Sequence, residues 1–366
     1  AVYSQGTANT TTAPAVKIVS GTIESTAAVS VYNNATGLIY ATGGTIKQQG
    51  SNSVIANNST GTIQLSGATV EKSSGTGGYA AIYNISTGTI KVTSGNINNS
   101  VSRAIYNKGA GTINVTGGTI SGTVGIDDVE GSISVTSGTI NATNGVGIRV
   151  GTGTAIISGS STKITGTTYG VDATTGTTTI KAGTIQATDG IGVQVAGGTL
   201  TIGTNETTPS VSTTVPSITG STKGVNVSSG TFNFYDGVIK GQSGAGTSIV
   251  GTVTATPTNY NVYKTVDNDN VESAILMQEH TLTVNQNGGV WNGSSAISRV
   301  KDVTKSVISI GEPIAPSPYV ITCNQNVEGR PDVKLNAIRV FDGWTLSGAG
   351  SLVNSSAKGR FIYKNC

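Results

Sequence analysis

The sequence predicts an all-β fold: a parallel β-helix (β-solenoid) with three strands per coil, followed by a small C-terminal β domain. The first observation is composition, because β-branched residues and 52 glycines dominate while only 11% of the residues are charged. The second is a unit of about 20 to 27 residues that recurs between residues 17 and 240. The third is an abrupt change of sequence character near residue 280.

Each repeat unit holds three short apolar segments in a fixed order. The first segment, which often reads Thr-Ile-x-Val, contributes Ile39, Ile63, Ile90, Ile113, Ile133, Ile156, Ile180, Leu200 and Phe232. The second, which mostly reads Gly-Thr-Ile, contributes Ile23, Ile46, Val70, Ile97, Ile120, Ile140, Ile164, Ile185 and Ile239. The third contributes Val31, Ile55, Ile82, Ile105, Ile126, Ile148, Val171, Val193 and Val225.

These segments are too short for helices, and their apolar residues alternate with polar ones. A single coil cannot bury its apolar side, so we expect coils to stack about 4.8 Å apart with like segments paired in parallel. Alternation also predicts an outward column of threonines in the second segment, made of Thr45, Thr69, Thr119, Thr139 and Thr184.

The residue two positions after each third-segment anchor is expected to point inward at a corner. In chain order these residues are Asn33, Asn57, Asn84, Asn107 and Asp128, followed by Val150, Ala173, Val195 and Val227. Stacked side-chain amides can satisfy one another along such a column. The sequence therefore predicts a buried asparagine ladder in the N-terminal half only.

Outside the repeats we predict three further regions. Residues 1–16 form an extended segment, and residues 241–279 form an irregular last coil, a cap and a linker. Within the repeats, residues 203–221 are an insertion. Residues 280–366 form the C-terminal domain.

The repeat pattern resembles the right-handed parallel β-helix of bacterial adhesins, autotransporter passengers and pectate-lyase-like proteins. The resemblance concerns architecture, because Gly-Thr-Ile is a packing motif that carries no chemistry. It implies an extracellular location, to which the N-terminal sequence Ala1-Val2-Tyr3-Ser4 adds the expectation of a cleaved signal peptide.

The C-terminal region carries landmarks in a recognisable order. A strand-like segment leads to Asn287-Gly288-Gly289, then Gly311-Glu312-Pro313, then Phe341-Asp342-Gly343-Trp344. This order resembles the internalin-type B repeat (Listeria–Bacteroides repeat), which implies a β-grasp-like module of a bacterial surface protein. The final strand common in that family is missing, so either the module is trimmed or another chain donates the strand. Residues 1–16 are a candidate donor for head-to-tail filaments.

Catalytic motifs are sparse. The single histidine, His280, lies at the predicted domain boundary, and we expect no enzyme activity, cofactor, metal site or membrane span. A net charge of +3 without a basic run disfavours nucleic-acid binding. Cys323 and Cys366 either form a disulfide or are two unrelated thiols.

The enzymatic alternative, a polysaccharide-degrading protein, needs clustered carboxylates. Asp127, Asp128 and Glu130 are the best candidates, although Asp127 is expected to form an outward ion-pair column with Arg149 and Asp172. The cluster Asp267, Asp269 and Glu272 either binds Ca²⁺ or forms a solvated turn, and its spacing does not match an EF-hand.

An outward tyrosine column is the candidate binding surface. Tyr32, Tyr83 and Tyr106 share one outward position, where they either contact a host or matrix glycan or protein, or simply stack on one another. The sequence therefore predicts a secreted, non-catalytic bacterial surface protein with a structural or adhesive role, with polysaccharide binding or degradation as the alternative.

Overall fold

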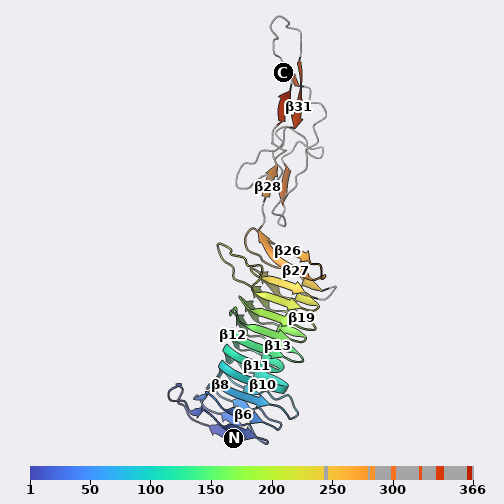
Figure 1. Ribbon diagram of the computed structural model, residues 1–366. Coiled ribbons are helices and arrows are strands. Elements are labelled where there is room, and N and C mark those ends of the chain that lie inside the picture. Colours follow the sequence, from blue (N-terminus) through green and yellow to red (C-terminus); the bar gives the residue numbers. More distant parts are fainter. Residues whose placement is uncertain are drawn as a thin grey trace. The chain divides into compact units, whose positions relative to one another are not determined.

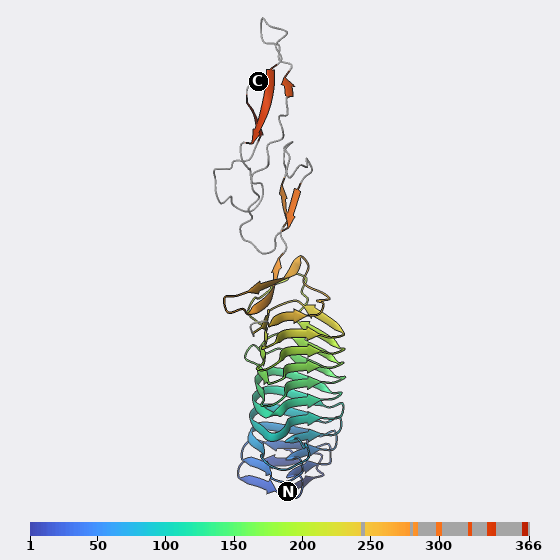
Figure 2. The same ribbon diagram turned by 90° about the vertical axis from the view of Figure 1, so that its right-hand side faces the viewer.

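The computed structural model describes residues 1–242 and 246–278 and, beyond these, five strands within 281–364. The chain divides into two compact units, Ala1–Leu276 and Met277–Cys366. Every described element is a β-strand, and the first unit is a parallel β-solenoid of about 10 turns (Figures 1 and 2). The described residues contain no helix that is long and apolar enough to cross a membrane.

Strands of the first unit form three parallel stacks that follow the three predicted segments. The first stack contains β2 (Val16–Ile18), β5 (Leu38–Ala41), β14 (Thr154–Ile157), β17 (Thr177–Ile180), β20 (Thr199–Ile202) and β23 (Thr231–Phe234). The second contains β3 (Thr22–Ser25), β6 (Thr45–Gln48), β15 (Lys163–Gly166), β18 (Thr184–Ala187), β21 (Ser217–Gly220) and β24 (Val238–Gly241). The third contains β1 (Val2–Ser4), β4 (Val31–Asn33), β7 (Ile55–Asn57), β9 (Ile82–Asn84), β13 (Val146–Val150), β16 (Tyr169–Ala173), β19 (Ile191–Val195), β22 (Lys223–Val227) and β25 (Thr247–Val250).

Four long strands turn a corner without a break and so belong to more than one stack. They are β8 (Thr62–Lys72), β10 (Thr89–Asn107), β11 (Thr112–Asp128) and β12 (Ser132–Ala142). The register shifts between Val115 and Thr119 where β11 pairs with β12, which marks the bend. Gly118 adopts a positive φ of 82° at this bend, a conformation that side chains other than glycine rarely tolerate.

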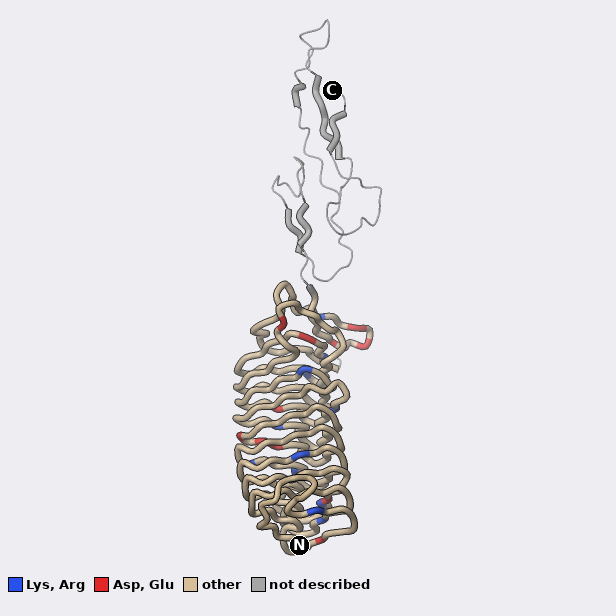
Figure 3. Tube along the Cα trace, turned by 90° about the vertical axis from the view of Figure 1, so that its left-hand side faces the viewer, with Lys and Arg blue, Asp and Glu red and all other residues tan. Residues whose placement is uncertain are grey.

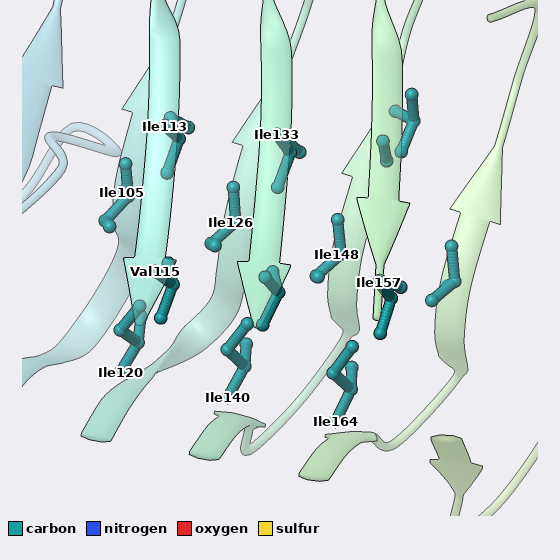
Figure 4. Close-up of a cluster of buried hydrophobic side chains, with 14 of the residues drawn as sticks. Ile105, Ile113, Val115, Ile120, Ile126, Ile133, Ile140, Ile148, Ile157 and Ile164 are labelled. Carbon is teal, nitrogen blue, oxygen red and sulfur yellow. The ribbon is translucent and has the colours of Figure 1, made fainter. Parts of the chain in front are cut away.

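Like residues pair with like between coils, which confirms the winding prediction. Ile113 pairs with Ile133 and Ile120 with Ile140 in parallel register. Both Ile113 and Ile133 are buried, and the inward isoleucines and valines of all three stacks form one continuous core. Figure 4 shows the repeated rows, in which side chains of equivalent positions, such as Ile120, Ile140 and Ile164, lie side by side along the stack.

One predicted core position is wrong. Ile156 is 44% exposed, because β14 places Ala155 and Ile157 inward and Ile156 between them outward. The first inward column therefore passes from Ile133 to Ala155. Ile180, which is buried as predicted, continues the neighbouring inward column from Ile157.

The stack is also longer than residues 17–240. At its start Val2–Ser4 pairs with Val31–Asn33, so the first residues are part of the chain's own sheet and not a free extended segment. The predicted insertion ends at Pro216, because Ser217–Gly220 pairs regularly with Thr184–Ala187. At the other end Val225 pairs with Ile249 in one further coil.

An antiparallel hairpin closes the C-terminal end of the stack. It consists of β26 (Tyr260–Val266) and β27 (Glu272–Gln278), and β27 pairs antiparallel with β24. Ala274 and Leu276 of β27 are buried against the last coil. The hairpin thus covers backbone and apolar side chains that an open end would expose.

In the second unit the structure describes backbone strands only. These are β28 (Thr281–Val284), β29 (Ser298–Lys301), β30 (Ile321–Cys323), β31 (Leu335–Phe341) and β32 (Phe361–Lys364). Strands β28 and β29 pair antiparallel, and β31 pairs antiparallel with both β30 and β32. The unit is thus all-β where it is described, while the β-grasp-like module stays a prediction.

Two adjacent isoleucines test the register. Ile157→Ala is expected to destabilise the solenoid by about 2–5 kcal/mol, because it empties a filled inward position. Ile156→Ala, the matched control, is expected to change stability by less than about 0.5 kcal/mol because Ile156 points outward. Urea unfolding followed by circular dichroism measures both. Equal costs for the two variants would contradict this register.

Candidate functional site: polar columns and the tyrosine face

The predicted asparagine ladder is present and buried. Each Nδ2 donates to the Oδ1 of the next coil: Asn33 to Asn57 at 3.0 Å, Asn57 to Asn84 at 2.9 Å and Asn84 to Asn107 at 2.7 Å. The second Nδ2 hydrogen of each amide goes to a corner carbonyl in its own coil, as from Asn84 to Gly88 at 2.9 Å. Both donor hydrogens of every ladder amide are therefore satisfied inside the core.

Asp128 ends the ladder as an acceptor. Asn107 Nδ2 donates to Asp128 Oδ1 at 2.5 Å, and the backbone N–H of Gly131 donates to the same carboxylate. The next residue of the column, Val150, has no acceptor to offer. Aspartate accepts from Asn107 without bringing the amide N–H group of an asparagine, which would need an acceptor towards Val150. Its second oxygen, Oδ2, is buried without a hydrogen-bond partner.

The corner changes length where the ladder ends. In the asparagine coils the corner glycine follows the asparagine by four positions, and its carbonyl accepts the amide. From Asp128 onward the glycine follows by three positions, as in Asp128–Gly131 and Val150–Gly153. The ladder and the longer corner thus occur together: where the glycine follows by four positions, its carbonyl accepts from the asparagine of its own coil.

Ladder asparagines also dictate the glycines of the following coil. A methyl group on Gly88 would collide with Asn57 Nδ2, and one on Gly111 would collide with Asn84 Nδ2. Glycine is required at these two positions because the asparagine side chain of the preceding coil lies too close for any Cβ atom, and not because of the backbone conformation.

Sequence reasoning missed a second buried polar column at the corner after the second stack. It contains Gln48, Lys72 and Asn99, which pair in register and are at most 1% exposed. Lys72 Nζ donates to Gln48 Oε1 (3.1 Å), Gly50 O (2.6 Å) and Ser74 O (3.1 Å), and burial lowers the pKa of its ammonium group. Each of these residues stands two positions after an inward anchor of the second segment (Ile46, Val70 or Ile97). The alternation of inward and outward residues could therefore have predicted that all three point inward.

The tyrosine column is a stacked aromatic row in two parts. Tyr83 and Tyr106 stack with ring centroids 5.3 Å apart, and Tyr32 stacks on Tyr3 at 5.5 Å. Between the pairs the column contains Ala56. The tyrosine rings therefore stack on one another, and Tyr3 joins the set. Contact with a glycan or protein stays a prediction.

The same outward column continues as an ion-pair ladder. Arg103 contacts Asp127 and places its guanidinium 4.6 Å from the Tyr106 ring centroid. Arg149 then lies 3.8 Å from Asp127 and 3.3 Å from Asp172. The predicted alternation of Asp127, Arg149 and Asp172 is confirmed. Arg103, which pairs with Val124 and so lies beside this column, adds a second arginine next to the two aspartates. Figure 3 shows how sparse charged residues are on the solenoid.

The carboxylates proposed for catalysis do not converge. Asp127 lies on the outer face of its strand, Asp128 points into the core, and Glu130 is exposed at the corner. Within the described residues no group of three or more His, Cys, Asp and Glu side chains could hold a metal ion.

The second acidic cluster forms a turn. Asp267 Oδ1 accepts the backbone N–H groups of Asp269 and Val271. Glu272 instead accepts from Ser248 and pairs with Lys264 at 3.0 Å. Asp267 thus stabilises the turn between β26 and β27. Glu272 joins β27 to Ser248 of the last coil and to Lys264 of β26.

Hydroxyl groups line the other faces. The predicted threonine column of the second stack is in register but interrupted by Asn96 and Lys163. The first stack carries an uninterrupted outward column of Thr62, Thr89, Thr112, Ser132, Thr154, Thr177, Thr199 and Thr231. His280 and Cys366 lie outside the described residues, as does the side chain of Cys323, so the disulfide remains a prediction.

Comparison with known proteins finds no matching family model, no matching curated protein and no matching solved structure.

A central ladder residue should matter more than the first one. Asn84→Ala is expected to cost about 2–4 kcal/mol, because it leaves a donor on Asn57 and an acceptor on Asn107 buried without partners. Asn33→Ala, the matched control, should cost less, since Asn33 Oδ1 has no partner already. Chemical unfolding measures both, and a larger loss for Asn33→Ala would contradict the ladder.

Stability should also fall as the pH rises through the titration of Asp128. Burial raises the pKa of its carboxyl from 3.8 to about 6, and Asp127 and Glu130 add to the effect. The folded state therefore binds the proton more tightly than the unfolded state. Its stabilisation is complete below about pH 4 and is lost by about pH 7, an effect on the order of 3 kcal/mol.

The variant Asp128→Asn should remove this part of the pH dependence. A smaller slope of the same sign should remain, because burial also raises the pKa values of Asp172 and Asp236. Unfolding curves recorded between pH 3.5 and 8 test the point. An unchanged pH slope in the variant would show that Asp128 is not the group concerned.

Proposed function

We propose that the chain is an extracellular structural and adhesive protein of a bacterial surface, in which a stiff solenoid presents columns of side chains to its surroundings. The observation that carries the proposal is the register: equivalent positions of successive coils pair, so outward side chains line up in rows in which similar residues often recur. Such rows offer the same contact many times along one axis, which suits multivalent attachment.

Stiffness is supported by the core. The inward aliphatic columns are continuous, and the asparagine ladder adds hydrogen bonds between successive coils. Bending the solenoid would break several such contacts at once. This supports a structural role that loops or a loosely packed domain would not serve.

The tyrosine column supports adhesion and favours polysaccharide binding as the second candidate. Tyrosines combine apolar area with a polar tip, and they are frequent in contact surfaces. Polysaccharide degradation has weaker support, because Asp127, Asp128 and Glu130 point in different directions.

The C-terminal sequence landmarks add to the proposal. Their resemblance to the internalin-type B repeat is a resemblance to modules of bacterial surface proteins. Filament formation by donation of residues 1–16 has less support, because β1 and β2 are already paired with β4 and β5.

An adhesion assay on beads coated with the full chain tests the proposal. Retention under flow is measured on immobilised matrix proteins, host glycans and bacterial polysaccharides. The double variant Tyr83→Ser/Tyr106→Ser is expected to reduce retention at least about tenfold, whereas Tyr40→Ser, on the first stack, should not. No retention of the unmodified chain on any surface would refute the adhesive role.

A further inference from the structure

A hollow of about 520 Å³ opens beside the first two coils, next to the N-terminal pair of the tyrosine column. It is lined by Tyr3, Tyr32, Asn52 and the run Ala27–Val29, together with Ala1 and Val2. We propose that this hollow binds one ring of a neutral glycan. The inference rests on the proposed adhesive function and names the ligand class for one place on the surface.

The lining matches the two-sided chemistry of a sugar ring. Tyr3 and Tyr32 stack on each other with their ring planes inclined by 6°, and Tyr3, the first ring of the row, is 59% exposed. Ala27, Ala28 and Val29 add apolar surface, while Asn52 and the tyrosine hydroxyls add hydrogen-bonding groups. A pyranose ring carries an apolar C–H face and a hydroxyl edge, which correspond to these two kinds of wall.

The absence of charged side chains in the lining selects a neutral ligand. Neither a lysine nor an arginine side chain is among the residues that line the hollow. A uronic acid would therefore lose hydration of its carboxylate and find no cationic side chain among the lining residues.

The site is organised before a ligand arrives. Asn58 Nδ2 donates to Asn34 Oδ1 at 3.0 Å, and Asn34 Nδ2 donates to the Tyr3 hydroxyl at 3.0 Å. Asn52 Nδ2 donates to Ala27 O at 2.7 Å, which ties the facing wall to the next coil. These bonds hold Tyr3 and the wall in place, so binding costs less ordering of side chains.

This outward amide chain follows from the ladder inside. Asn33 and Asn57 point inward and bond to each other, while their neighbours Asn34 and Asn58 bond to each other outside. The same pairing of coils thus fixes both the core and the orientation of Tyr3. The volume of the hollow also lies within the usual range of ligand sites, about 300–1,000 Å³.

Titration calorimetry of the full chain with three probes tests the inference. The probes are an uncharged β-linked glucose or mannose hexasaccharide, an oligogalacturonate of the same length, and phenol. We expect the neutral hexasaccharide to bind best. Tyr32→Ala and Tyr3→Ala should each weaken binding at least about tenfold, and Asn34→Ala about threefold, whereas Tyr40→Ala should stay within about twofold.

Circular dichroism and melting curves establish that the variants are folded. Tighter binding of oligogalacturonate or phenol, no binding of the neutral hexasaccharide, or equal binding by Tyr32→Ala would overturn the inference. The bead assay separates it from the proposed function. If Tyr32→Ala binds the hexasaccharide as the unmodified chain does, while Tyr83→Ser/Tyr106→Ser beads detach, the adhesive function stands and the sugar site at the hollow does not.

Discussion

Parallel pairing of like residues in successive coils is the constraint on which the rest of the structure depends. Once Ile113 pairs with Ile133, the other residues of the same strand lie beside their counterparts, and the register shifts only at the corners. Each inward position thus belongs to a buried column, and each outward position belongs to a row on the surface. The core is therefore filled by aliphatic side chains where the repeat supplies β-branched residues. Polar side chains are buried where they form hydrogen bonds with the next coil or with corner carbonyl groups.

The asparagine ladder and the corner show how strictly this constraint acts. An amide column needs an acceptor in each corner, a glycine in the following coil and a residue that can end the chain of donors. The four-residue corners, Gly88 and Gly111, and Asp128 meet these needs in turn. Beyond Asp128 the corner shortens and Val150 fills the same place, so one solenoid contains two kinds of cross-section.

Function is proposed to come from the outward rows, since the core leaves little room for variation. A single outward column passes from stacked tyrosines through an ion-pair ladder to the amides of Gln194 and Asn226, which bond at 2.8 Å. The aromatic part has the chemistry of a contact surface, whereas the ionic part satisfies itself. The hollow beside Tyr3 and Tyr32 is the place where this column meets a concave wall.

The sequence by itself determined the winding, the inward columns and the ladder with its end at Asp128, because alternation within a strand and repetition between coils are both local patterns. It did not determine whether Ile156 or Ile157 faces the core, since adjacent apolar residues make both registers possible until the neighbouring coil selects one. It also did not reveal the three oxygens around Lys72 or the bond from Asn34 to Tyr3. Those contacts join residues of different coils and corners, so only the tertiary structure decided them.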